Sequence, residues 1–189
     1  MSEHGIHVHG AHDHAVEHEA QKGGLGQQVA IFSAVLATVG AIVSFLGGHT
    51  QNEALLYKNE AAIRRAEASD QWNFYQAKSS KQNLAELGAT LTTGDQQARY
   101  QAEVTRYNRE KNEIMPEAKK LEDDSKAAEE KSEASMHVHH RWAQATTLIQ
   151  IAIALAAITI LTRNRGLQYT AYGVAAAALA VGALALAHV

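Results

Sequence analysis

The residues best suited to chemistry in this sequence are the histidines near its N-terminus. The segment HGIHVHGAHDHAVEH, residues 4–18, mixes imidazoles with carboxylates, which are ligands that suit Zn, Ni and Cu(II). The pattern predicts a metal buffer or sensor, with candidate ligands at His4, His7, His9, His12, His14 and His18. The alternative is a flexible tail that responds to pH near about 6.5, because the small residues between the histidines impose no fixed geometry.

A second histidine group is MHVHHRW, residues 136–142. An antiparallel helical hairpin would bring His49 from the first arm to about the same level, so that a Cu or Zn site could form. The candidate ligands there are His49, His137, His139 and His140. We prefer the alternative that His49, Arg141 and Trp142 anchor the helices at headgroup depth, because each has a polar and an apolar part.

No pattern in the sequence points to catalysis. There is no cysteine, which excludes disulfides, thiolate zinc sites and cysteine nucleophiles. We find no phosphate-binding glycine loop, nucleophile elbow or HExxH motif. The net charge is −3 and no basic block occurs, so a nucleic-acid partner is not expected. We expect a protein that is not an enzyme, and we identify no small-molecule substrate.

The elements that would position these residues begin with three uncharged, apolar runs at 29–48, 143–162 and 169–189. Each has about 20 residues, the length that a helix needs to cross a bilayer core. The alternative is three buried helices of a soluble protein, but a chain of 189 residues would then have too little polar surface to cover them. The sequence therefore predicts three transmembrane helices and the lipid bilayer as a partner.

These runs contain no Asp, Glu, Lys or Arg, and their polar residues include Gln150 and several Ser and Thr. An ion-coupled transporter needs an ionisable group at that depth, so this chain alone is a poor candidate for one. Small residues at four-residue intervals instead predict faces for close helix packing, within or between chains. These faces comprise Ser33, Ala37 and Ala41; Gly40, Ser44 and Gly48; and Ala178 and Gly182.

The polar middle of the chain, residues 49–141, has a composition that favours helices on either side of one break, LTTGD at 91–95. It predicts two long helices in an antiparallel hairpin that pairs position n with about 186 minus n. Arms of about 42 residues would reach roughly 60 Å from the membrane. Pro116 is expected to kink or interrupt the second arm, because proline lacks a backbone donor and clashes with the preceding turn.

Both arms show the alternating spacings of 4 and 3 that are typical of a coiled coil. The seam predicted for the second arm contains Tyr100, Val104, Tyr107, Lys111, Ile114, Ala118, Leu121, Ser125, Ala128, Ser132 and Ser135. The seam predicted for the first arm contains Leu56, Ile63, Ala66, Asp70, Asn73, Ala77, Ser80, Leu84, Leu87 and Leu91. Small residues bury little apolar area, so membrane anchors or further chains must help to hold the arms together.

An aromatic cluster stands out in the first arm, in ASDQWNFYQAK at 68–78. At about 100° per residue, its three aromatic side chains cover more than half of the helix circumference, which is more than a two-helix seam buries. The cluster predicts an interaction surface for a second neighbour, and we favour another copy of the chain over mutually exposed aromatics. The surface comprises Trp72, Phe74, Tyr75, Tyr100 and Tyr107.

The same segment, with Ala68-Ser69-Asp70-Gln71-Trp72 followed by Tyr75-Gln76-Ala77-Lys78, resembles a bacterial membrane family catalogued as domain of unknown function 4337. The resemblance covers nearly the whole chain. It implies a bacterial inner-membrane protein with three spans and a helical hairpin. It implies no activity, substrate or cofactor.

The predicted fold is an all-α membrane protein in which a long antiparallel hairpin, a coiled-coil stalk, separates the first and second of three transmembrane helices. The expected order is a His-rich tail (1–24), helix (25–48), hairpin (49–141), helix (142–162), basic turn (163–168) and helix (169–189). By the positive-inside tendency the basic turn would be cytoplasmic and the hairpin external, although basic residues near the hairpin base argue the other way.

We expect a structural or interaction protein that forms a homo-oligomer or serves as an accessory subunit of a larger membrane complex. One alternative is Cu, Ni or Zn binding through the tail and the membrane-surface histidines. Another is a channel or transport role that arises only on oligomerisation, for which the small-residue faces are the supporting feature.

Overall fold

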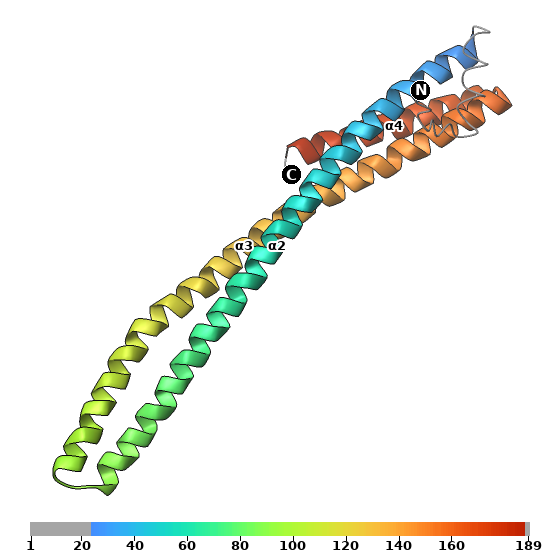
Figure 1. Cartoon of the computed structure of the whole chain (residues 1–189). Helices are drawn as coiled ribbons and strands as arrows, with labels where there is room; N and C mark the ends of the chain where they lie inside the picture. The colour runs from blue at the N-terminus through green and yellow to red at the C-terminus, as the bar shows by residue number, and fades with distance from the viewer. Residues whose placement is uncertain (1–23, 188–189) are drawn as a thin grey trace, which may run out of the picture. The chain divides into compact units, whose positions relative to one another are not determined.

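Residues 24–187, which the computed structural model describes, form three α-helices (Figure 1). They are α2 (Leu25–Leu91), α3 (Asp95–Thr162) and α4 (Arg165–Leu186). Each contains a stretch long and apolar enough to cross a membrane, judged by length and composition. The predicted all-helical fold with three long helices is therefore confirmed. The six histidines of the tail lie outside the described residues, and the metal prediction made for them stays a prediction.

Two short breaks separate the helices. Between α2 and α3, Gly94 has a φ of 67°, a left-handed conformation that glycine adopts without steric cost. Between α3 and α4, Asn164 caps the last helix, because its side-chain oxygen accepts a hydrogen bond from the backbone N–H of Gly166 at 2.8 Å. The first break lies within the LTTGD segment in which the sequence predicts a turn.

The described residues divide into two compact units. Residues 24–52 and 135–187 form the first, called here the apolar bundle, and Glu53–Ala134 form the second, called the hairpin. In the bundle, α4 packs beside the first part of α2 and the last part of α3 (Figure 1). In the hairpin, the remaining parts of α2 and α3 run antiparallel and are joined by the 92–94 turn (Figure 1).

The core of the apolar bundle is built around Trp142, which is 4% exposed. The indole has room because two glycines face it. A Cβ on Gly47 would come within 3.1 Å of the Trp142 Cβ, and a Cβ on Gly182 would lie 3.7 Å from its Cζ3. An anchor at headgroup depth would turn its ring outward, whereas the Trp142 ring points into the core, since glycines on two other helix segments admit it there. Its predicted companions differ: His49 is exposed and Arg141 is half-buried.

Small residues in the bundle occur in two settings: some pack against another helix of the chain, and others are exposed. Gly40 faces Ile149, whose Cγ2 would lie 3.1 Å from a Cβ placed on the glycine. Ala178 is buried with Gly182 on one face of α4, so this predicted packing face is used inside the chain. On α2, by contrast, Ala37, Ala41 and Ser44 are exposed.

Helix α3 continues through Pro116, so of the predicted kink or interruption of the second arm, the interruption does not occur. Pro116 lies on the exposed face of the helix, while Ile114 and Ala118 on either side of it are buried. The backbone carbonyl that loses its donor is therefore on the side that water can reach. The packed face of the arm is maintained across this position.

Candidate functional site

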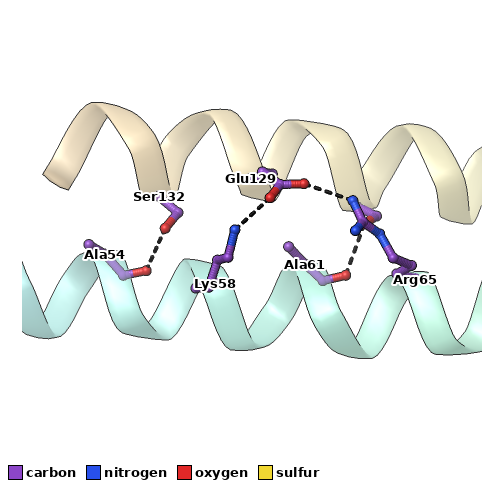
Figure 2. Close-up of polar contacts among 7 residues, drawn as sticks. Ala54, Lys58, Ala61, Arg65, Glu129 and Ser132 are labelled. Carbon is purple, nitrogen blue, oxygen red and sulfur yellow. Dashed lines mark hydrogen bonds and ion pairs between the residues drawn. The ribbon is translucent and has the colours of Figure 1, made fainter. Parts of the chain in front are cut away.

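The central feature of the hairpin is the seam where its two arms meet. Ala54, Ala61 and Ala68 recur every seven residues on α2 and are at most 4% exposed. Ser132 Oγ donates a hydrogen bond to the backbone carbonyl of Ala54 at 2.8 Å (Figure 2), and Ser125 Oγ donates to that of Ala61 at 2.9 Å. The residue numbers in both pairs sum to 186, which confirms the predicted pairing of the arms.

The seam works because no side chain longer than that of serine stands between the two backbones at these positions. A serine hydroxyl is short, so it reaches a carbonyl of the other helix only when the helices lie close together. Each accepting carbonyl keeps its own helical hydrogen bond, since a carbonyl oxygen has two lone pairs. Alanine spacing and serine hydrogen bonds are thus two parts of one arrangement.

The register predicted for the first arm is wrong. All ten of its positions are exposed, including Leu56 at 69% and Leu91 at 75%. The prediction followed the large aliphatic residues, whereas the close approach of the backbones selects the alanines two positions before them. The register predicted for the second arm is correct, because Ile114, Ala118 and Ser125 are buried and most other predicted positions are half-buried.

Charged residues flank the seam beside Glu129. Lys58 approaches one carboxylate oxygen of Glu129 at 2.5 Å, and Arg65 approaches the other at 2.8 Å (Figure 2). The hydrogen bond and charge of Lys58, with the charge of Arg65, hold the pKa of Glu129 below its ordinary value. Both cations come from α2 and the carboxylate from α3, so the ion pairs connect the two arms.

The aromatic cluster is partly covered within the chain. The Trp72 and Tyr75 rings pack edge to face, with centroids 5.6 Å apart. The Lys78 ammonium lies 5.0 Å from the Phe74 ring centroid and 5.9 Å from that of Tyr107, within the range of a cation–π contact. The structure therefore pairs several of the predicted surface aromatics with neighbours of their own hairpin, and Phe74 remains 53% exposed.

Lysines bridge the two arms beside these aromatics. Lys78 on α2 approaches Glu110 on α3 at 2.6 Å, and this contact holds the pKa of Glu110 below its ordinary value. Lys111 donates hydrogen bonds to Ser79 at 3.2 Å and Gln82 at 3.0 Å. That these lysines contact the aromatic rings and bridge the two arms was not predicted from the sequence. The available signal was the four-residue spacing of Phe74 and Lys78, which puts a cation beside an aromatic on one helix face.

Nearer the turn, Tyr100 packs its ring against the backbone of Gly88. A Cβ on that glycine would lie 2.9 Å from three atoms of the ring, which is too close to be accommodated without movement. Tyr100, predicted as part of an interaction surface, thus packs against a residue of the other arm, and its side chain is 37% exposed. A larger residue at position 88 would require the Tyr100 ring to move.

A shallow hollow of about 420 Å³ lies beside the seam of the hairpin. Trp72 forms part of its wall, and polar or charged side chains supply much of the rest. Its other lining residues are Arg65, Ala68, Ser69, Asn73, Gln76, Glu122, Ser125 and Lys126. Arg65 is already engaged with Glu129, and the small residues of the seam explain why space is left here.

The described histidines do not assemble into a metal site. No group of three or more His, Cys, Asp or Glu side chains within residues 24–187 is placed to hold a metal ion. His49, His137 and His140 are exposed. His139 instead places Nδ1 2.8 Å from the carbonyl oxygen of Gly47, and its ring centroid lies 5.8 Å from that of His140.

Comparison with known proteins gives one match. The sequence model of a family described as Domain of unknown function (DUF4337) matches residues 25–188, which is most of the 189-residue chain. The resemblance drawn from the aromatic segment is confirmed by this match. No curated protein and no solved structure matches the chain.

Proposed function

Because the chain belongs to the DUF4337 family, whose description assigns no activity, we propose a function from the geometry alone: a membrane-anchored, non-catalytic interaction protein. In this proposal the three apolar helix stretches sit in the bacterial inner membrane, and the hairpin is an external coiled-coil stalk. The stalk presents a surface on which copies of the chain associate, or which joins it to a larger membrane complex.

The observation that carries the proposal is an unpartnered stripe along α2 of the hairpin. Leu56, Ile63, Leu84 and Leu91 lie at multiples of seven residues from one another and are all at least half exposed. Asp70 and Ala77 occupy the two heptad positions between them, so the stripe consists of two apolar patches. A heptad-spaced apolar stripe is the pattern by which one helix packs along another. Since α3 already occupies the alanine stripe of the same helix, the aliphatic stripe is available for another chain.

The composition of the seam supports a structural role. Within the described residues, the buried groups of the hairpin are alanines, serines and Ile114, and its close ionic contacts are lysine or arginine with glutamate. These contacts connect the arms. They do not place a nucleophile beside a base, which covalent catalysis requires.

The test uses the full chain in native membranes or in mild detergent. We expect chemical crosslinking and mass measurement to detect oligomers or a stoichiometric partner. Replacing Ile63 and Leu84 together by lysine should reduce that association, because two charges would enter an apolar contact. Ala127→Lys, at an exposed position of α3, is the matched control. Monomers alone, without any co-purifying chain, would contradict the proposal.

A further inference from the structure

Gln150 carries the amide nearest the middle of the apolar part of α3, the run 143–162. It lies eight residues after Trp142 and twelve before Thr162, so the helix rise puts it about 12 Å and 18 Å from these two ends. In the apolar bundle its side chain is exposed and does not face the core. If this helix crosses a bilayer, Gln150 therefore meets hydrocarbon near mid-depth.

The threonine hydroxyls in the same run are satisfied within α3. The hydroxyls of Thr146, Thr147 and Thr159 each donate to the backbone carbonyl four residues earlier, at 2.8 to 2.9 Å. Such a contact suits a short hydroxyl side chain. Among residues 24–187, no hydrogen-bond partner is found for the Gln150 side chain. An amide facing lipid without a partner is strongly unfavourable, since hydrocarbon offers neither donor nor acceptor.

The helix face around Gln150 is suited to close packing. Ala143, Thr147 and Ala154 stand seven and three residues before it and four after it, and all three are exposed. Side chains this small let the backbone of another transmembrane helix approach α3. An interhelical hydrogen bond from Gln150 would then be short enough to form.

We infer that Gln150 is the residue through which two copies of this chain pair inside the bilayer, amide to amide across a two-fold axis. The inference rests on the membrane location proposed above. We assign a second copy of the chain as the partner of this helix face because a glutamine amide carries both an NH₂ donor and a carbonyl acceptor. The amide is therefore complementary to itself. A two-fold interface places the same residue of each copy opposite its counterpart.

The absence of cysteine from the sequence allows single-cysteine crosslinking in membranes. Thr147→Cys and Ala154→Cys, each with Gln150 retained, should form disulfide-linked dimers on oxidation. Adding Gln150→Leu should weaken association about threefold to tenfold, the range expected for one interhelical hydrogen bond. Gln150→Asn should restore part of the crosslinking. Leu179→Cys, an exposed position on α4, is the control and should crosslink less.

The outcomes separate the inference from the membrane proposal. Extraction of the chain from membranes by alkaline carbonate would contradict the membrane proposal itself. If the chain stays in the membrane, crosslinking unchanged by Gln150→Leu, or equal crosslinking at Leu179, would overturn the inference. Disulfide crosslinking of Thr147→Cys or Ala154→Cys to a different membrane protein, without dimers of this chain, would also overturn it. Helicity measured by circular dichroism should be unchanged in Gln150→Leu, which separates lost association from misfolding.

Discussion

In the hairpin, α2 and α3 meet at alanines spaced by seven residues, and serine hydroxyls reach across to the opposite backbone. In the apolar bundle, the same two helices meet at Gly40 and Gly47, and large side chains of α3 fill the space above the glycines. Small residues permit close packing in both regions. The difference lies in what the partner helix contributes: a hydrogen bond in one case and a large apolar side chain in the other.

This difference between the two regions follows from the surroundings proposed for each, water for the hairpin and lipid for the bundle. In water, alanine burial contributes little at about 25 cal/mol per Å², so hydrogen bonds and ion pairs between the arms supplement it. In lipid, moving apolar surface from the hydrocarbon into a contact between helices gains no hydrophobic free energy. Close van der Waals packing therefore has to stabilise the contact. A tryptophan against two glycines supplies many such contacts.

The largest effect should come from removing the side chain at the centre of the bundle. Trp142→Ala should lower the free energy of unfolding by about 3 to 5 kcal/mol, because it leaves a cavity opposite Gly47 and Gly182. Thermal unfolding of the full chain, followed by circular dichroism in detergent, would measure this. Trp72→Ala is the matched control in the hairpin, where the indole is half-buried. Equal losses for the two tryptophans would contradict the difference drawn between the regions.

An intermediate effect is expected from enlarging the alanine seam. Ala61→Leu should destabilise the chain by about 1 to 3 kcal/mol, because the larger side chain separates the arms and the Ser125 hydrogen bond is lost. The neighbouring Ala62→Leu is the control, since that position is exposed. Hydrogen exchange of the hairpin amides would report the change locally. A hairpin that tolerates leucine equally at both positions would show that close approach is unimportant.

The smallest effect should come from the ion pairs of Glu129. Its pKa is lowered in the folded chain, so the stabilisation is complete above the ordinary glutamate pKa and is lost as pH falls through the folded-state value. The melting temperature should therefore drop between about pH 6 and about pH 3. Glu129→Gln should show a smaller drop, because the neutral amide does not titrate. Identical pH dependence in both proteins would rule out a contribution from this carboxylate.

The parts of the fold that were predictable from sequence depend on neighbouring residues along the chain. Uncharged runs of sufficient length identify three apolar helices, and a glycine followed by aspartate identifies the turn at Gly94. The hairpin pairing then follows from the position of that turn. The seam of the second arm was also predictable, because apolar Ile114 and Leu121 stand out among charged residues.

The parts that were not predictable depend on the opposite helix. In the first arm, alanine occurs on several faces, and the choice of Ala54 and Ala61 is made by Ser132 and Ser125 across the seam. The burial of Trp142 similarly needs glycines on two other helix segments. The candidate surface was identified by its aromatics, but its pairing with lysines could be determined only once the two arms were placed side by side.

The three-residue connection between α2 and α3 restricts how the arms can slide. A seam of alanines at every seventh position looks nearly the same after a shift of one heptad, or about 10 Å along the helix. Residues 92–94 reach about 11 Å at most when fully extended, and they must already cross the distance of about 8 to 10 Å between the two helix axes. They therefore cannot also span such a shift, and the pairing set by the turn is the one that the serines then hold. The connection therefore selects one alignment among several that the seam alone would tolerate.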